Sequence, residues 1–529
     1  MKRLPFEKYR PYQPINLKDR TWPNRQITRA PVWCSVDLRD GNQALIDPMT
    51  VDQKLKMFKL LVALNFKEIE IGFPAASGTE YQFCRRLIEE NLIPHDVCVQ
   101  VLCQSRDHLI ERTFEALQGA HSVIFHLYNS TSKLQREVVF NAGAEEIQEI
   151  ALKGTRKIKS MRGQLKNCRF RFQYSPESFT GTELDVALQI CNAVTAEWGA
   201  TPKDKIILNL PATVEMSTPN IYADMIEWMH TRLDKRDSII ISIHPHNDRG
   251  CAVAASELAL MAGGERIEGT LFGNGERTGN VDICTLALNL YSQGVDPALY
   301  LGDMPTIMEI VEGCTRIPVH PRHPYAGDLV YTAFSGSHQD AINKGLKALK
   351  QKHSPYWEVP YLPIDPHDLN RTYEAVIRIN SQSGKGGVSY ILETNYGFKM
   401  PRSMQVEFSK VIQHYSDKKQ KEVTTLEIRK LFYEHYVDKN TPLSIIKYRM
   451  ETLENIAGCE CEFIFKYGAE THTQHISGTG PIDAFFKMIK SYTGTDCTLT
   501  DYSESTMGNG SDASAHYYSV SGGTLSCVQ

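Results

Sequence analysis

The sequence predicts an α/β protein whose first half is a (β/α)8 TIM barrel. Short apolar runs rich in β-forming residues recur along it, and segments with helical periodicity separate them. Strands that alternate with helices indicate parallel pairing through right-handed crossovers. Eight such units within about 275 residues match this barrel, whereas an open doubly wound sheet more usually has six strands. The predicted strands are 32–38, 68–73, 97–102, 122–128, 169–174, 206–210, 238–243 and 267–272.

The segments between these runs predict the helices of the barrel. Residues 51–64 and 183–198, for example, repeat apolar side chains at the spacing of one helix face. With a helix after each strand, all the carboxyl ends of the strands lie at one mouth of the barrel, where the active sites of this fold are found.

Polar side chains follow most of the runs, which is the third observation behind the barrel. They are Arg39-Asp40, His126 with Asn129, Ser175-Pro-Glu177, Thr213-Val-Glu215, His244 with His246, and the segment 273–280. Polar loops alone would explain Asn129 or Glu215. They do not explain two histidines, an Arg-Asp pair and a Gly-Asn-rich loop together. The pattern therefore predicts an enzyme.

Two histidines at the end of the seventh run predict a metal site. His244 and His246 are two residues apart, so on a strand they point the same way. Imidazole is the commonest metal ligand, and a carboxylate can complete such a pair. Closure of an eight-stranded barrel leaves only the eighth strand between the first and the seventh. Asp40 is therefore expected beside the histidines.

The rest of the chain predicts three further regions around a barrel at 31–305. Residues 1–30 form an N-terminal extension, and 306–438 form a mostly helical linker with helices near 306–350, 402–416 and 424–437. Prolines exclude regular elements over 355–366. Residues 439–529 form an α+β domain, with one βββα unit and a second that is expected to be truncated, without its last strand and helix.

Composition excludes several classes of protein. Charged residues make up 23% and hydrophobic residues 42%, and a net charge of -4 argues against a nucleic-acid binder. No apolar run is long enough to span a membrane, and the first ten residues do not resemble a signal peptide. The 13 cysteines include no Cys-x-x-Cys, so a reduced, cytoplasmic protein is expected. Cys459 and Cys461 are expected to pack in a core rather than bind a metal.

These motifs together resemble the 2-isopropylmalate synthase family, in its larger bacterial form. The resemblance covers nearly the whole chain. Its pieces are 37–43, 72–76, 126–131, 173–177, 210–215, 244–248, 273–280, Ser-Gly-Ser-His338-Gln-Asp and Arg371-Thr-Tyr373. The segments 37–43 and 244–248 alone mark a broader superfamily, which includes homocitrate and citramalate synthases, a thioester lyase and carboxyltransferase domains.

The resemblance implies a reaction and its cofactors. Such enzymes condense acetyl-CoA, as co-substrate, with 3-methyl-2-oxobutanoate and water to give 2-isopropylmalate and CoA, the first committed step towards leucine. The reaction needs a Lewis acid on the ketone, a base for the methyl proton and stabilisation of negative charge. One carboxylate and two imidazoles suit Zn²⁺, Mn²⁺ or Co²⁺, whereas the family is commonly described as dependent on Mg²⁺ or another divalent ion, so the metal stays open.

The resemblance also implies roles for single residues. Asn280 becomes a weaker metal ligand, Glu177 and Thr213 contact the 2-oxo acid, and His126 lines its pocket. Glu177 is in addition a candidate acid–base group. Arg39 can fork onto substrate oxygens and hold the developing alkoxide. A salt bridge to a neighbouring carboxylate is the alternative and does not exclude this role.

Residues of the linker are implied to act across a homodimer. His338 and Tyr373 would reach the active site of the partner subunit and assist proton transfer. His338 could equally be a surface residue of a helix.

The C-terminal domain is implied to bind leucine and inhibit the barrel. The expected truncation of its second unit predicts weakened or absent feedback, which a leucine titration would test.

Four rival functions stay open at this point. A sister synthase would act on 2-oxoglutarate or pyruvate, and one sequence cannot measure the pocket that discriminates them. The lyases rely on a cysteine in the loop after the eighth strand, which is absent from 273–279. A carboxyltransferase needs a modified lysine, and no lysine stands at a matching strand end. An inactive amino-acid sensor is hard to reconcile with intact barrel motifs.

Overall fold

The computed structural model describes residues 10, 12–332, 335–371, 385–419, 423–438, 443–452, 458–494, 499–507, 514–521 and 524–528. The chain forms two compact units, Met1–Val330 and Tyr331–Gln529. The predicted boundaries at 30, 305 and 438 divide the chain more finely than these two units and stay predictions.

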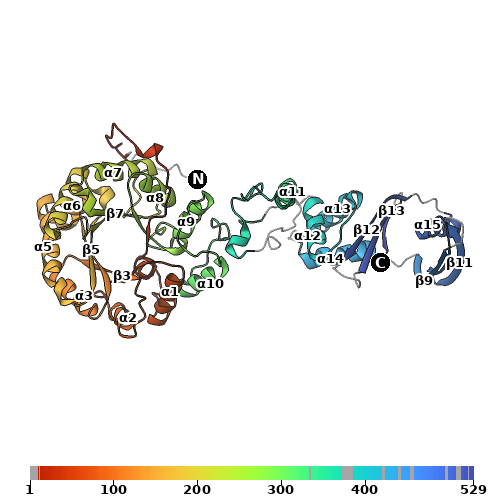
Figure 1. Cartoon of the computed structure of the whole chain (residues 1–529), viewed down its shortest axis with the longest axis horizontal. Helices are drawn as coiled ribbons and strands as arrows, with labels where there is room; N and C mark the ends of the chain where they lie inside the picture. The colour runs from red at the N-terminus through yellow and green to blue at the C-terminus, as the bar shows by residue number, and fades with distance from the viewer. Residues whose placement is uncertain are drawn as a thin grey trace. The chain divides into compact units, whose positions relative to one another are not determined.

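The first unit contains a closed barrel of eight strands in sequence order, which confirms the predicted fold (Figure 1). The strands are β1 Val32–Ser35, β2 Glu68–Gly72, β3 Cys98–Gln104, β4 Ser122–Ser130, β5 Arg169–Glu177, β6 Ile206–Ala212, β7 Ile239–Pro245 and β8 Arg266–Gly269. All neighbouring pairs are parallel. The barrel closes where β1 pairs with β8, with Val32 opposite Arg266 and Ser35 opposite Gly269. This closure places β8 between β1 and β7, as the site prediction required.

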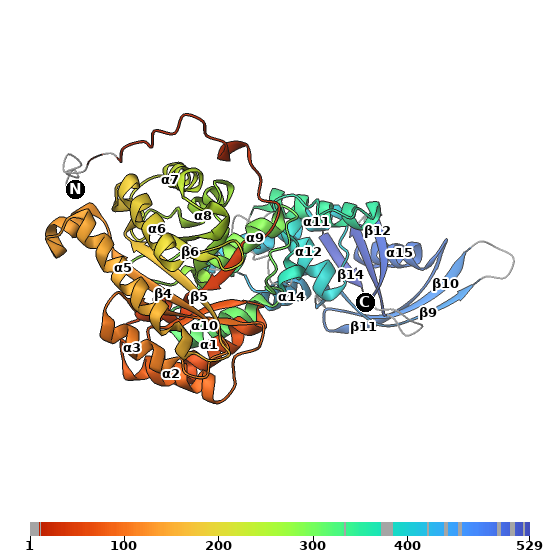
Figure 2. The same ribbon diagram turned by 60° about the vertical axis from the view of Figure 1, so that its left-hand side comes forward.

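Ten α-helices of the first unit are described, most of them around the barrel (Figures 1 and 2). They are α1 Val51–Ala63, α2 Gly78–Glu89, α3 Asp107–Ala116, α4 Lys133–Gln135, α5 Ala144–Met161, α6 Leu184–Trp198, α7 Pro219–Arg232, α8 Ala252–Met261, α9 Ile283–Ser292 and α10 Met304–Thr315. α1 shows how the sequence sets such a helix. Thr50 and Gln53 form a capping box at its start, and Met57, Phe58 and Leu61 face the core.

Single turns lie between these elements. They are η2 Trp22–Asn24, η3 Asp37–Gly41, η4 Arg136–Phe140, η5 Arg162–Gln164, η6 Phe179–Gly181, η7 Arg236–Ser238 and η8 Leu271–Gly273. The N-terminal segment before β1 is held on α7 by two buried carboxylates. Asp224 accepts from the Nε of Arg20 at 2.6 Å, and Glu227 accepts from the backbone N–H of Trp22 at 3.1 Å.

The second unit begins with helices and short turns. They are α11 Gly336–Lys352, η9 Pro366–Leu369, α12 Lys385–Tyr396, α13 Arg402–Lys419, α14 Thr425–Phe432 and η11 Tyr433–Val437. The two amphipathic helices predicted near 402–416 and 424–437 correspond to α13 and to α14 with η11.

A βββα unit follows, as predicted. Strands β9 Leu443–Thr452, β10 Cys459–Tyr467 and β11 Glu470–Gly478 form an antiparallel sheet with β10 in the centre, and α15 Pro481–Thr493 packs on it. Its buried core is the cluster Cys459, Cys461, Phe463, Phe465, Ala484 and Met488. Core packing of the two cysteines is therefore confirmed.

A second antiparallel sheet corrects one expectation. Its strands are β12 Leu499–Met507, β13 Ser514–Ser521 and β14 Thr524–Val528, in that order. The prediction that the second unit lacks its last strand is wrong, because β14 pairs with β13 from Tyr517–Val528 to Ser521–Thr524. Strands of three to five residues are common, so the short segment after Gly523 is long enough to form one.

Candidate active site

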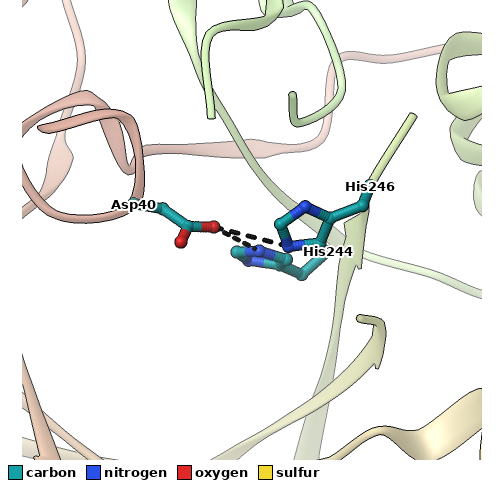
Figure 3. A group of neighbouring side chains, drawn as sticks. All are labelled: Asp40, His244 and His246. Atoms are coloured by element: carbon teal, nitrogen blue, oxygen red, sulfur yellow. Dashed lines mark hydrogen bonds and ion pairs between the residues drawn. The ribbon is translucent and has the colours of Figure 1, made fainter. Parts of the chain in front are cut away.

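Asp40, His244 and His246 lie together at the C-terminal mouth of the barrel. Their ligand atoms lie within 4.8 Å of one another, and all three side chains are buried. The Nε2 atoms of His244 and His246 are 3.1 and 3.5 Å from the same oxygen, Oδ2 of Asp40. Figure 3 shows both imidazoles directed at this carboxylate. No other group of three His, Cys, Asp or Glu side chains comes as close within the described ranges.

Local backbone structure aims these three residues. Asp40 belongs to η3, a π-helical turn directly after β1, in which the N–H of Gly41 donates to the carbonyl of Val36 at 3.1 Å. Such π turns are frequent at functional sites. The buried ammonium of Lys54 on α1 donates to the Leu38 carbonyl at 2.9 Å and holds the turn from outside. His244 and His246 stand at the end of β7, where strand spacing directs both side chains inward.

Asn280 joins the cluster from the loop after β8. Its Nδ2 donates to Oδ2 of Asp40 at 2.8 Å and lies 3.1 Å from Nε2 of His244. Its Oδ1 is buried and has no hydrogen-bond partner. A flip of the Asn280 side-chain amide by about 180° would exchange Nδ2 and Oδ1 and present the oxygen to a cation. A carboxylate, two imidazoles and an amide oxygen therefore fit a divalent cation.

The protonation of the cluster follows from its contacts. Burial alone would raise the pKa of Asp40, but Arg39 and the two histidines outweigh burial and hold this pKa well below its usual value. Burial would lower the pKa of His244, but hydrogen bonds to Asp40 and Glu268 raise it to about 9. Burial and the neighbouring His244 lower the pKa of His246 to about 4. A carboxylate and one positive charge thus occupy the place where a cation would bind.

Arg39 and His126 are linked by a carboxylate that was not predicted as a site residue, Glu70 of β2. The guanidinium of Arg39 lies 2.7 Å from Oδ1 of Asp40 and also pairs with Oε1 of Glu70. Oε2 of Glu70 is 2.7 Å from Nδ1 of His126, whose Nε2 is 2.7 Å from the hydroxyl of Ser175. Burial would raise the pKa of Glu70, but Arg39 and His126 lower it to about 2.

One cavity of about 270 Å³ at the mouth is lined by Arg39, Asp40, His126, His244 and His246. Its lining also includes Glu177 and Thr213, so the predicted substrate contacts share a single pocket with Arg39, Asp40 and the histidines. The carboxylate of Glu177 accepts from the hydroxyl of Ser130, and Oγ1 of Thr213 accepts from the N–H of Ser178 at 2.9 Å. The remaining lining residues are Gln43, Leu102, Tyr128, Ser175, Asn209, Pro211, Glu276 and Arg277.

His338 and Tyr373 belong to the second unit, Tyr331–Gln529. His338 lies on α11 in the second unit, exposed, with its ring stacked on Tyr361 at a centroid distance of 4.1 Å. Tyr373 lies outside the described residues. Both assignments stay predictions.

The fold and the cluster, whose residues could hold a metal ion, define a class: a barrel of the HMGL-like family. The family model described as HMGL-like matches residues 30–311. Residues 328–393 match the model of the alpha-isopropylmalate synthase post-catalytic domain, and 422–520 match that of the LeuA allosteric (dimerisation) domain.

Relatives narrow the class further. A 2-isopropylmalate synthase of Rhodospirillum rubrum is 55% identical over 515 residues, which cover 97% of this chain and 92% of the relative. One of Clostridium acetobutylicum is 52% identical over 519 residues, with 97% and 93% covered. The chain belongs to the 2-isopropylmalate synthase family and is therefore an acyltransferase of leucine biosynthesis. Of the helices that the structure describes, none has both the length and the apolar character needed to cross a membrane.

Proposed function

We propose that this protein condenses acetyl-CoA with 3-methyl-2-oxobutanoate and water, and releases 2-isopropylmalate and CoA, in a reaction that requires a divalent cation. The observation that carries the proposal is the convergence of Asp40, His244 and His246 in the cavity that Arg39 and Glu177 also line. Membership in the family supports the choice of substrates over 2-oxoglutarate or pyruvate.

Asp40, His244 and His246 would hold the cation, with Asn280 as a weaker ligand. When bound, the ion acts as a Lewis acid on the 2-oxo acid. The donor set accepts Mg²⁺, Mn²⁺ or Zn²⁺, and imidazole ligands favour the last two.

Arg39 stabilises the charge that the reaction creates. Its guanidinium is fixed by Asp40 and Glu70, so it can fork onto substrate oxygens without reorganising. As the methyl carbon of acetyl-CoA loses a proton and bonds to the ketone carbon, the ketone oxygen becomes an alkoxide that the Arg39 guanidinium stabilises. A proton then neutralises the oxygen, water adds to the thioester carbonyl, and the CoA thiol leaves.

Proton transfer falls to the groups around the substrate. Glu177 and Thr213, which line the cavity, would contact the 2-oxo acid, and His126 lines the pocket with its ring held between Glu70 and Ser175. Glu177 is the acid–base candidate within the barrel. His338 and Tyr373 of a second copy would complete the site near the thioester in a homodimer, an assembly that the match to the dimerisation domain favours.

Release of free CoA by the purified full-length protein tests this function. We expect release with 3-methyl-2-oxobutanoate, much less with pyruvate or 2-oxoglutarate, and none after chelation until a divalent ion is restored. Faster release with another 2-oxo acid, or full activity after exhaustive chelation, would contradict the proposal.

His338 tests the part played by the partner subunit. The substitution His338→Ala should lower kcat by about 10- to 100-fold, because a proton-transfer group is lost, while the metal affinity stays unchanged. After subunit exchange, a mixture of His338→Ala and Asp40→Asn should regain activity, because one site in each mixed dimer keeps both groups. A kcat within a small factor of the wild-type value would show that His338 is a surface residue.

A further inference from the structure

Charged side chains fill the interior of the barrel behind the proposed metal site. Glu68 on β2, and Arg266 and Glu268 on β8, are buried, and Arg171 on β5 is mostly buried. The interior of such a barrel is ordinarily packed with branched apolar side chains. This layer therefore departs from the usual composition.

The four side chains form one chain of alternating charge. Arg171 donates to Oε1 of Glu68 at 2.6 Å, and Arg266 donates through Nε to the other oxygen of Glu68 at 2.6 Å. Nη1 of Arg266 donates to Oε1 of Glu268. The second oxygen of Glu268, Oε2, lies 2.9 Å from Nδ1 of His244. The chain thus ends on a proposed metal ligand.

Stability does not account for this arrangement. Removing charges from water costs several kcal/mol for each ion, and buried ion pairs are commonly no more stable than well-packed apolar residues of the same volume. What the layer does supply is a carboxylate with a single orientation. Oε1 of Glu268 is held by Arg266 and by Nε2 of Gln173 at 2.6 Å, so Oε2 is left to face His244.

The two histidines differ in this respect. Nδ1 of His246 is buried and has no hydrogen-bond partner, whereas Nδ1 of His244 faces a carboxylate. A carboxylate that accepts from Nδ1 keeps a proton there, so Nε2, which faces Asp40 at 3.1 Å, is the nitrogen that loses its proton and offers its lone pair when a cation binds. In metalloproteins such partners orient the ligand and raise its basicity, and their loss typically costs 10- to 100-fold in metal affinity.

We propose that Glu268, anchored by Arg266, is the positioning residue that fixes His244 with its Nε2 towards the cation and so sets the metal affinity of the site. The inference rests on the proposed metal site of Asp40, His244 and His246. Glu268 does not touch the substrate; it acts through His244.

The substitution Glu268→Gln is the sharpest test. Because Arg266 and Gln173 both donate to Oε1, the amide oxygen must take that position, and the amide N–H group then faces Nδ1 of His244. It would donate to Nδ1 and place the imidazole proton on Nε2, where it blocks metal binding. Arg266 keeps Glu68, Gln100 and Ser242 as partners, so the variant does not leave a buried charge unpaired.

Glu68→Gln is the matched control. It removes the same charge from the same layer and also contacts Arg266, but Glu68 does not touch any of the proposed ligands. Titration of the metal-free full-length protein with Mn²⁺ alone should give at least a tenfold weaker Kd for Glu268→Gln and a Kd within about threefold of wild type for Glu68→Gln. If Glu268→Gln does not fold, Glu268→Asp, which keeps the charge but shortens the reach, should still bind Mn²⁺ less tightly than Glu68→Gln.

The outcomes separate this inference from the proposed function. A wild-type protein that binds no Mn²⁺ would remove the metal site itself. A wild-type protein that binds Mn²⁺ while Glu268→Gln binds it equally well, or while Glu68→Gln loses as much affinity, would overturn only the role of Glu268.

Discussion

The barrel buries charged side chains among its apolar ones, whereas the buried residues described in the βββα unit are all apolar. In the barrel, Glu70, Arg266 and Glu268 are buried beside Asp40 and the two histidines. In the βββα unit, the buried cluster around Phe463 and Phe465 contains only apolar residues. Both are sheet structures covered by helices, so the difference does not come from secondary structure.

The difference shows which buried interactions stabilise the fold and which ones fix the geometry of a site. Apolar burial contributes about 25 cal/mol per Å² and depends little on direction. Buried charges contribute little net stability but hold one another in fixed orientations. The apolar cluster around Phe463 and Phe465 therefore serves stability, whereas the charged side chains inside the barrel serve the geometry of a site. Three substitutions test this division.

The largest effect is expected at the site. Asp40→Asn keeps the size of the side chain but removes the charge that would bind the cation, so CoA release should fall by about 1,000-fold, equivalent to about 4 kcal/mol in the transition state. Asp96→Asn, at an exposed carboxylate paired with Lys67, is the control and should leave the rate unchanged. Thermal unfolding should remain cooperative in both variants. A modest loss of rate for Asp40→Asn would remove the charge of Asp40 from the mechanism.

The next effect is expected in the apolar core of the βββα unit. Phe465→Ala should destabilise this unit by about 3 kcal/mol, because a fully buried ring leaves a cavity. Its neighbour Ile464 is only partly buried, so Ile464→Ala should cost less than about 1 kcal/mol. Chemical denaturation of the full-length chain measures both. Equal losses would show that this core is not organised around Phe465.

The smallest effect depends on pH and concerns Asp37 at the start of η3. Burial raises the pKa of Asp37 to about 7, while hydrogen bonds from Ser35 and from the N–H of Leu271 oppose the shift. The folded state therefore binds the proton more tightly than the unfolded state. The free energy of unfolding that this tighter proton binding contributes is fully present below the ordinary pKa of 3.8. It is lost as the pH rises through about 7.

Asp37→Asn removes this dependence. Between pH 6 and pH 8.5, its advantage over wild type in unfolding free energy should grow by about 1–2 kcal/mol, because the wild-type carboxyl ionises in the folded state over this range. Denaturation at both pH values measures the difference. An advantage that is the same at both would show that the ionisation of Asp37 does not contribute.

The sequence determined the barrel and the cluster of Asp40, His244 and His246, because the eight recurring runs predict the barrel and its closure decides which strand ends are neighbours. Runs with strand composition separated by helical segments predicted the eight strands, and barrel closure brought Asp40 to His244 and His246. The partners behind this cluster could not be predicted. Both faces of a barrel strand are buried, so the order of residues in Glu68-Ile-Glu70 or Arg266-Ile-Glu268 does not reveal which side chains point inward.

Only the tertiary structure decided what those inward side chains meet. Glu70 joins Arg39 to His126, and Glu268 joins Arg266 to His244. Glu70 and His126 are 56 residues apart in the chain, and His244 and Glu268 are 24 residues apart. Such pairings depend on strand register and on the orientation of each side chain. These are set when the barrel closes, because a buried charge must then find its partner within the interior.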